Sequence, residues 1–329
     1  MNKRRLDVAI ERWPIAGAFA ISRGAKTHVD VVLTTIVGEH GTGRGEATPI
    51  YYHGETPESV VAQIESVRAE IEAGSGRSSL QQLLSRGAAR NALDAALWDL
   101  EAKESGRPAW QLARLPTPSP LTTAFTISLG TAEQMKRDAA AAAMRYPLLK
   151  LKLAGEGDIE RVAAVREGAP RARLIVDANE AWTGRDIVAE AAALAAFGVE
   201  LIEQPVRAGE DAALDGLQSP IPFCADESCQ DRADLARCAG RYAAINIKLD
   251  KAGGLTEALA LAQEARDMQL DLMVGCMLST SLGVAPAFLV AQGARWVDLD
   301  GPLLLVADRE PAIDFEGGCM HAPERKLWG

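Results

Sequence analysis

The feature that most constrains the fold is a series of charged residues that recurs at nearly constant steps in the second half of the chain. Lys152, Asp177, Glu203, Asp226 and Lys248 follow one another at steps of 25, 26, 23 and 22 residues. Each of them ends a short apolar stretch, and an alanine-rich, helix-like stretch separates it from the next. A step of this length fits one strand followed by one helix. We therefore expect these residues at equivalent ends of successive strands.

The apolar stretches predict eight strands from about residue 120 onwards, with helical stretches between them. The predicted strands are Thr122–Ile127, Leu148–Leu153, Leu174–Asp177, Glu200–Glu203, Ile221–Asp226, Ala244–Lys248, Asp271–Cys276 and Trp296–Leu299. Eight strands that alternate with helices favour a closed parallel barrel over an open sheet. Barrel enzymes build their sites at the carboxyl ends of the strands, so the recurring charges predict a site there.

The second predicted strand shows how these charges are oriented. Leu149, Leu151 and Leu153 share one face of it, and Lys150 and Lys152 share the other, because successive side chains alternate in a strand. We expect the leucines to pack under helices and the lysines to point into the barrel mouth.

The residues before this barrel predict a smaller α+β domain. Thr27 to Gly38 is rich in valine and threonine and runs into a glycine-rich turn, which is typical of a β-hairpin. Helices are predicted from about Pro57 to Ala73 and from Ser85 to Lys103.

Composition and charge exclude several classes of function. The 329 residues are 48% hydrophobic, which is enough for one large core, and the formal net charge of −10 disfavours binding to nucleic acid or anionic membranes. Five cysteines without a C-x-x-C pair suggest neither disulfides nor a zinc ribbon, so the cytoplasm is the expected location. No stretch of about 18 uninterrupted apolar residues occurs, so we expect no membrane span.

Three carboxylates form an all-oxygen set at the expected mouth. Asp177, Glu203 and Asp226 end three consecutive strands, and hard cations such as Mg²⁺ prefer oxygen ligands. Each acid taken alone could instead cap a helix or pair with a lysine. Together, converging anions without a cation would repel one another, so the trio predicts one Mg²⁺ per subunit.

Two lysines are expected on opposite sides of the same mouth. Lys152 and Lys248 come from the second and sixth of eight strands, and a substrate carbon between them would meet one lysine on each face. They could also simply pair with the acids. As bases they would remove and return a proton beside a carboxylate, with Mg²⁺ stabilising the enediolate. The nearby charge of Lys150 would favour a neutral Lys152 and help to stabilise the enediolate.

Five motifs closely resemble the enolase superfamily, in its muconate-lactonizing subgroup. They are Leu149-Lys-Leu-Lys152, Val176-Asp-Ala-Asn-Glu180, Ile202-Glu-Gln-Pro205, Cys224-Ala-Asp-Glu-Ser228 and Asn246-Ile-Lys-Leu-Asp-Lys-Ala-Gly-Gly254. The resemblance covers nearly the whole chain. It implies an α+β capping domain (1–115), a modified (β/α)₇β TIM barrel (116–310) and a carboxy-terminal segment that returns to the cap (311–329).

Within that subgroup the chain looks most like the dipeptide epimerases. Asp298 and Asp300 form a D-x-D on the eighth strand that in these enzymes receives the ammonium of the dipeptide, although a turn would also explain Asp300. Ile21-Ser-Arg-Gly24 resembles a mobile cap loop of these enzymes, which implies that Arg23 holds a glutamate side chain, although a solvated surface arginine is the alternative. Tyr51, Tyr52 and His53 are expected in a second cap loop that closes the site, although an ordinary surface turn explains them equally well.

The resemblance implies epimerisation of the second residue of a dipeptide, from L-Ala-D-Glu to L-Ala-L-Glu, in the recycling of cell-wall peptides. The alternatives on the same scaffold are N-succinylamino acid racemase, o-succinylbenzoate synthase and muconate cycloisomerase. A hypothesis from a different functional class is that the chain is a non-catalytic barrel that only binds a ligand. The expected partners are a small dipeptide and, as in relatives, further copies of the chain.

Overall fold

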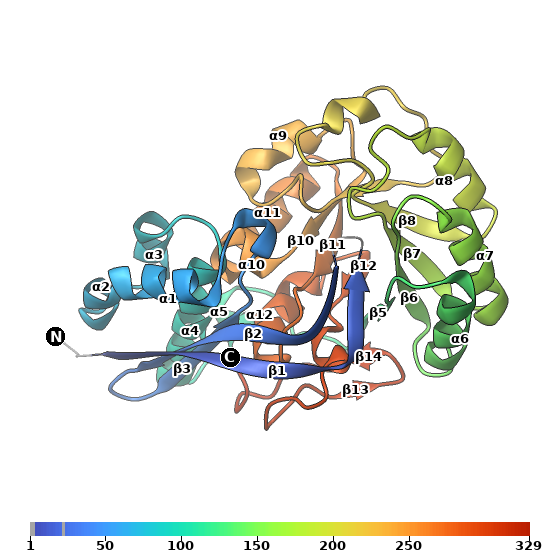
Figure 1. The fold of residues 1–329 in the computed structure, drawn as a ribbon. Coiled ribbons are helices and arrows are strands. Elements are labelled where there is room, and N and C mark those ends of the chain that lie inside the picture. The colour runs from blue at the N-terminus through green and yellow to red at the C-terminus, as the bar shows by residue number, and fades with distance from the viewer. Residues whose placement is uncertain (1–3, 22–23) are drawn as a thin grey trace.

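The computed structural model describes residues 4–21 and 24–329 and contains a parallel barrel beside a smaller antiparallel domain. Figure 1 shows the barrel, in green to orange, next to the blue amino-terminal sheet and its helices. Among the described residues, no helix has the length and hydropathy needed to cross a lipid bilayer.

The barrel has eight parallel strands arranged in the order of the sequence. They are β5 (Phe125–Ile127), β6 (Leu148–Lys152), β7 (Arg173–Asp177), β8 (Val199–Glu203), β9 (Phe223–Ala225), β10 (Ala244–Ile247), β11 (Asp271–Gly275) and β12 (Trp296–Asp298). The first and last strands meet where Ala124 N donates to Val297 O at 2.7 Å. The expected parallel barrel with a cap is confirmed, although the predicted first strand is divided. Its start, β4 (Leu121–Thr122), pairs instead with β14 (Cys319–Met320), next to β13 (Phe315–Glu316).

Helices cover the outside of the barrel, as expected from the alternating pattern. The longer ones are α6 (Ala132–Ala142), α7 (Asp158–Gly168), α8 (Ile187–Ala195), α11 (Leu255–Asp267) and α12 (Ser281–Ala291). Short turns of helix occupy the remaining places: η2 (Asp211–Leu214), η3 (Arg232–Asp234), α9 (Leu235–Cys238), α10 (Leu249–Ala252) and η4 (Gly301–Leu304). Leu149, Leu151 and Leu153 pack in the large core under these helices, as the alternation in the sequence predicted.

The cap is a three-stranded antiparallel sheet packed on helices. Its strands are β1 (Arg5–Ile21), β2 (Gly24–Val37) and β3 (Thr42–Ala47), which confirms the predicted hairpin and adds a long first strand that the sequence did not reveal. Its helices are η1 (Tyr51–His53), α1 (Pro57–Ser66), α2 (Arg68–Glu72), α3 (Arg77–Leu83), α4 (Ala88–Ser105) and α5 (Ala109–Leu112). The single helix expected over 57–73 is wrong, because the chain leaves the helical range at Val67 (φ −114°, ψ 11°).

Close backbone approach joins β3 to α4. A Cβ on Gly43 would lie 2.0 Å from Ala96 O, and one on Gly45 would lie 2.1 Å from Ala92 O. Only glycine fits at such distances, so these two residues let the sheet lie directly on the helix.

The same helix α4 joins the cap to the barrel. Arg90 donates to the carbonyl oxygens of Ala252 (2.6 Å) and Gly253 (3.0 Å), and Asn91 donates to the Asp250 carboxylate at 2.9 Å. The carboxy-terminal residues also reach this helix, where Trp328 Nε1 donates to Ala95 O at 3.0 Å. The cap is therefore fixed to the short helix α10, immediately after the sixth barrel strand.

Candidate active site

The barrel interior is built in layers that follow from the alternation of side chains. Eight buried apolar residues, one from each strand or its first neighbour, form a floor: Ala124, Leu148, Ile175, Leu201, Cys224, Ala244, Met273 and Trp296. The residues two positions further along form a mostly polar layer above it: Thr126, Lys150, Asp177, Glu203, Asp226, Asn246, Gly275 and Asp298. Lys152, Lys248 and Asp300 follow at the next inward positions. The structure thus brings together every site residue predicted from the barrel strands.

Lys150 lies at the centre of the polar layer and is 1% exposed. Its Nζ lies 2.6 Å from Glu203 Oε2, 2.7 Å from Asp298 Oδ2 and 3.4 Å from Asp177 Oδ2. Burial alone would lower the pKa of Lys150, but these carboxylates raise it well above its usual value. Lys150 is therefore a buried cation whose charge is balanced by three acids. Its expected effects on Lys152 and on the enediolate stay predictions.

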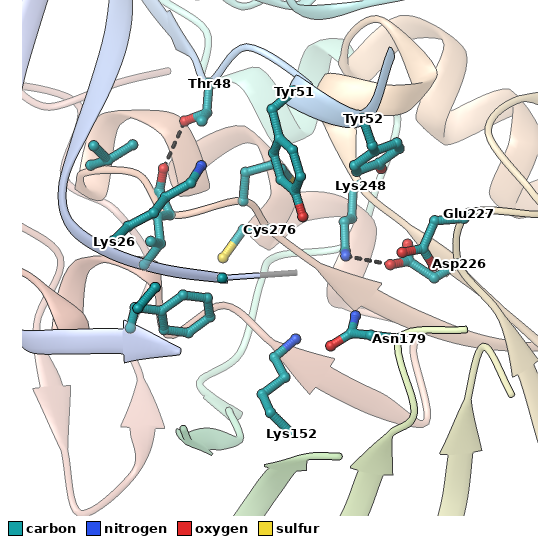
Figure 2. A pocket seen from close by; sticks show the side chains of 16 residues that line it. Lys26, Thr48, Tyr51, Tyr52, Lys152, Asn179, Asp226, Glu227, Lys248 and Cys276 are labelled. Carbon is teal, nitrogen blue, oxygen red and sulfur yellow. Dashed lines mark hydrogen bonds and ion pairs between the residues drawn. The ribbon is translucent and has the colours of Figure 1, made fainter. Parts of the chain in front are cut away.

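The two predicted bases come from β6 and from the residue that follows β10, and both point into the same pocket, as Figure 2 shows. Lys152 Nζ lies 2.7 Å from Asp177 Oδ2, and Lys248 Nζ lies 2.6 Å from Asp226 Oδ2. Burial opposes the charged form of Lys248, yet Asp226 and Glu203 raise its pKa well above its usual value. Each base is thus paired with a different carboxylate of the predicted metal site.

The three carboxylates end neighbouring strands and are at most 2% exposed. Asp177 is the ladder partner of Glu203, and Glu203 is the partner of Cys224, two residues before Asp226. Burial and then the charge of Asp177 raise the pKa of Glu203, as expected for acids that converge.

This donor set fits Mg²⁺, because it consists of carboxylate oxygens without a thiolate or imidazole at the same level. Within residues 4–21 and 24–329, no group of acids, cysteines or histidines stands in the arrangement of a preformed metal centre. The lysine ammonium groups lie against the acid oxygens instead. A cation bound there would have to displace these lysine contacts.

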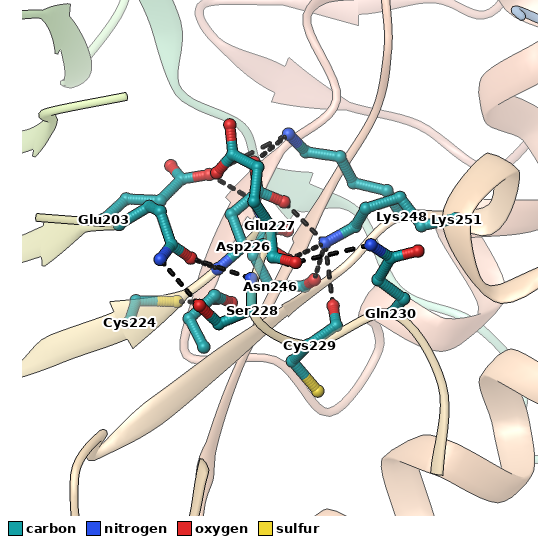
Figure 3. A network of polar contacts seen from close by, with 12 residues as sticks. Glu203, Cys224, Asp226, Glu227, Ser228, Cys229, Gln230, Asn246, Lys248 and Lys251 are labelled. Carbon is teal, nitrogen blue, oxygen red and sulfur yellow. Dashed lines mark hydrogen bonds and ion pairs between the residues drawn. The ribbon is translucent and has the colours of Figure 1, made fainter. Parts of the chain in front are cut away.

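Asp226 is also held from behind by two residues that the sequence analysis did not single out. Gln204 Oε1 accepts from the backbone N–H groups of Asp226 (2.8 Å) and Ser228 (3.1 Å), and Lys251 Nζ lies 2.6 Å from Asp226 Oδ1. Figure 3 shows Lys248 and Lys251 meeting the same carboxylate. The helical spacing of three residues from Lys248 was the available signal for Lys251.

A cavity of about 210 Å³ lies between the bases and the cap. Its lining joins barrel residues to cap residues, among them Phe19, Lys26, Thr48, Tyr51 and Tyr52. Tyr51 and Tyr52 thus reach the pocket as the resemblance suggested. Lys26 was missed, because a single charged residue in a strand of the cap is usually a surface residue.

Among the described residues of the cap, Lys26 is the cation that lines this pocket. Its Nζ lies 4.5 Å from the centre of the Tyr51 ring, and partial burial lowers its pKa. Arg23 lies outside the described residues, so its predicted role stays a prediction.

A second, smaller cavity of about 30 Å³ shares both bases with the first and is lined by the two predicted ammonium-binding acids, Asp298 and Asp300. Asp298 Oδ2 accepts from Lys150, whereas the buried Asp298 Oδ1 has no hydrogen-bond partner within the described part of the chain. Asp300 Oδ2 accepts from Thr126 N at 2.7 Å, and burial together with Asp298 raises the pKa of Asp300 to about 7. Asp298, which lines this cavity, therefore keeps one buried carboxylate oxygen without a hydrogen-bond donor among the described residues.

At this barrel mouth, acids from three neighbouring strands lie between two lysines, and an α+β cap covers the site. This arrangement defines an enolase-type barrel enzyme. The chain belongs to the mandelate racemase/muconate lactonizing enzyme family. Residues 3–113 match the amino-terminal domain of that family, and residues 132–326 match the enolase C-terminal domain-like model. The membership expected from the sequence motifs is confirmed.

The relatives specify the subgroup. The chain is 44% identical to the L-Ala-D/L-Glu epimerase of Escherichia coli (97% of this chain, 99% of the relative). It is 42% identical to an N-acetyl-D-glutamate racemase of a Pseudoalteromonas species (91% and 95%).

Solved structures agree with this family. One is an enolase family member from Agrobacterium tumefaciens with homology to dipeptide epimerases, solved with bound sodium and L-Ala-L-Glu. It superposes on this chain with a TM-score of 0.96 at 50% sequence identity, and the match covers 99% of this chain and 100% of that one. Other dipeptide epimerases, at 25% to 30% identity, are complexed with Mg and a dipeptide.

Proposed function

We propose that this chain is a Mg²⁺-dependent epimerase that interconverts L-Ala-D-Glu and L-Ala-L-Glu by moving the α-proton of the second residue. The observation that carries the proposal is the placement of Lys152 and Lys248 across one pocket, with Asp177, Glu203 and Asp226 on the strands between them. The names of the relatives and neighbours support the choice of substrate.

The chemistry follows from this placement. Asp177, Glu203 and Asp226 would hold the Mg²⁺, which supplies positive charge next to the carboxylate of the substrate. One of the lysines Lys152 and Lys248 removes the α-proton, and the other donates a proton to the opposite face, so that the centre inverts.

Lys150 has a different role from the two bases. It is buried below them and paired with three carboxylates, so it remains an ammonium and stabilises the negative charge of the enediolate.

The two cavities fit the two ends of the dipeptide. The unsatisfied Asp298 Oδ1 in the small cavity would accept a hydrogen bond from the substrate ammonium, with Asp300 beside it. Lys26 in the large cavity, together with Arg23, would favour an acidic side chain on the second residue.

Racemisation of an N-acylated glutamate is the second candidate. It is favoured by the contact between Asp298 Oδ2 and Lys150, which already occupies one oxygen of that carboxylate, and by the 42% identity to the N-acetyl-D-glutamate racemase of a Pseudoalteromonas species. An N-acyl substrate has no ammonium and would need neither Asp298 nor Asp300.

Proton NMR in D₂O with purified protein and Mg²⁺ tests the proposal by following the α-proton of the second residue. The substrates are L-Ala-D-Glu, L-Ala-L-Gln, L-Ala-L-Phe and N-acetyl-D-glutamate. Exchange with L-Ala-D-Glu and much slower exchange with the other dipeptides is the expected result. Preferential exchange of N-acetyl-D-glutamate would establish the second candidate, and equal exchange of all dipeptides would contradict selection of an acidic side chain.

The role of the cap cations is tested with the same assay. Arg23→Ala should reduce the preference for L-Ala-L-Glu over L-Ala-L-Gln, and Lys26→Met should reduce it in the same direction. Arg12→Met is the matched control, because Arg12 is a cap cation that pairs with Asp30 outside the pocket lining. An unchanged preference in Arg23→Ala would remove Arg23 from the substrate site.

A further inference from the structure

We propose that Lys251 is a positioning residue that fixes the Asp226 carboxylate and thereby sets the affinity of the site for its divalent cation. This inference rests on the proposed function, because it takes Asp226 as a metal ligand. It adds a residue outside the pocket to the set that determines cation binding.

The contacts of Lys251 all converge on Asp226 and its surroundings. Its Nζ lies 2.6 Å from Asp226 Oδ1 and donates to the Asp226 carbonyl oxygen. The same ammonium donates to Cys229 O at 2.9 Å and to Asn246 O at 3.1 Å. One buried cation therefore ties the side chain of Asp226 to its own loop and to strand β10, as Figure 3 shows.

Burial separates Lys251 from the chemistry of the pocket. Its side chain is 0% exposed, and it is absent from the lining of both cavities at the mouth. It does not line the pocket, so its effect on the reaction is indirect and passes through Asp226 and the backbone that it holds.

The position of Lys251 is itself fixed by the cap. It lies on α10, a single helical turn that starts directly after Lys248 and ends at Gly253 in the left-handed conformation (φ 78°). Arg90 of α4 binds the carbonyl oxygens of Ala252 and Gly253. A Cβ on Gly253 would lie 2.5 Å from Arg90 Nε, so the turn and the arginine are packed without spare room.

The two oxygens of Asp226 therefore have different partners. Lys251 occupies Oδ1 from the protein interior, and Lys248 contacts Oδ2 from the pocket at 2.6 Å. Asp226 would be one of the residues that hold a cation in the mouth, and Lys251 would keep its carboxylate in place. Without Lys251, the carboxylate can rotate and Lys248 becomes its main partner, which competes with the cation.

Two effects of removing Lys251 oppose each other. Loss of a positive charge near the site favours cation binding, and loss of the fixed ligand orientation disfavours it. Since the charge of Lys251 is compensated by Asp226 at 2.6 Å, we expect the orientation effect to dominate. Partners that orient metal ligands typically change metal affinity by about 10- to 100-fold.

The test measures binding of Mg²⁺ by calorimetry and of Mn²⁺ by electron paramagnetic resonance in the whole protein, without substrate. Lys251→Met should weaken the Kd for both ions by about 10- to 100-fold. Lys251→Gln, which keeps an amide donor, should lie between this variant and the wild type. Circular dichroism and thermal unfolding identify the variants that remain folded.

A double-mutant cycle tests whether Lys251 acts through Asp226. Adding Lys251→Met to Asp226→Asn should leave the Mn²⁺ Kd within about threefold of the Asp226→Asn single variant. The matched control is Lys103→Met, because Lys103 pairs with buried Asp99 at 2.7 Å in the cap, away from the mouth. This control should lose stability and keep the metal affinity of the wild type.

The outcomes are distinct. An unchanged or tighter Kd in a folded Lys251 variant overturns the inference, and so does a full additional loss in the Asp226→Asn background. A wild-type protein that binds neither Mg²⁺ nor Mn²⁺ would overturn the proposed function instead.

Discussion

The ammonium of Lys248 lies 2.6 Å from Oδ2 of Asp226, so a proposed base and a proposed metal ligand share one contact. The same relationship joins Lys152 and Asp177 at 2.7 Å on the other side of the mouth. If Asp177 and Asp226 hold the cation as proposed, cation binding and release of the two lysines towards the substrate would be linked.

Lys248→Ala should abolish epimerisation, because a single remaining base serves only one face of the α-carbon. Loss of a positioned acid–base group costs about 10²- to 10⁴-fold in rate. Exchange of the α-proton from the face that Lys152 serves should persist for one dipeptide isomer in D₂O. Lys152→Ala is the mirror control, with exchange retained for the other isomer, and full activity in either variant would contradict two-base catalysis.

The same Lys248→Ala variant should bind Mg²⁺ more tightly than the wild type. The competing ammonium at Asp226 Oδ2 is removed, and a gain of about 1.4 kcal/mol corresponds to about tenfold in Kd. Calorimetry with Mg²⁺ measures this change. A weaker Kd would show that Lys248 supports the ligand instead of competing with the cation.

Asp298→Asn should distinguish a dipeptide from an N-acyl substrate. The amide removes the charge that would pair with the substrate ammonium, a contact worth about 1.5 to 3 kcal/mol, or roughly 10- to 100-fold in kcat/KM. The steady-state ratio of kcat/KM for L-Ala-D-Glu and N-acetyl-D-glutamate reports the effect and cancels changes common to both. A constant ratio would exclude Asp298 from ammonium binding.

Asp94 should make the stability of the seam between cap and barrel depend on pH. It lies on α4, accepts from Thr256 N at 2.9 Å on α11, and burial raises its pKa from 3.8 to about 6. The folded state holds the proton more tightly than the unfolded state. The stability it contributes is therefore present below pH 3.8 and falls as the pH rises to about 6.

The measurement for Asp94 is urea unfolding of the wild type and Asp94→Asn between pH 4 and 7. Between pH 4 and 7, the unfolding free energy of the variant should rise relative to that of the wild type by about 2 kcal/mol. The constant cost of replacing the carboxyl by an amide does not affect this change with pH. A difference that stays constant with pH would contradict the raised pKa of Asp94.

Gly43→Ala should destabilise the cap, because the added Cβ would lie 2.0 Å from Ala96 O and 2.5 Å from Leu100 N of the helix backbone. Overpacking of this kind costs about 1 to 3 kcal/mol. Gly76→Ala is the matched control, since no atom lies within 4 Å of its added Cβ. Equal unfolding midpoints for both variants would mean that β3 can move away from α4.

The barrel was predictable from the sequence because its signal is local and repeated. In β6 the alternation of Leu149, Lys150, Leu151 and Lys152 fixes which side chains face the helices and which face the mouth. The regular steps between charged residues then place Asp177, Glu203 and Asp226 at one level. Both signals depend on strand geometry alone.

Other features depend on contacts between distant residues, which one sequence does not reveal. Lys251 lies on a four-residue helix and Gln204 has a positive φ (37°). The spacing of Lys251 from Lys248 does not by itself reveal a contact with Asp226, and Gln204 has no periodic pattern. The pairing of Lys150 with three acids depends on which rotamers fit together inside the barrel. The sequence did not reveal the length of β1, because this edge strand of the cap carries a mixture of polar and apolar residues.

The apolar floor of the barrel determines from which side a substrate can reach the site. Trp296, Leu148 and the other residues of this layer fill the barrel below Lys150, so a substrate enters and a product leaves on the side that the cap covers. Substrate entry and product release then use the same opening between cap and barrel, here called the gate, which is lined by Phe19, Lys26 and Tyr51 among others. Turnover by such an enzyme can be limited by the opening of that gate, and mutations far from the reacting carbon would then change kcat through product release.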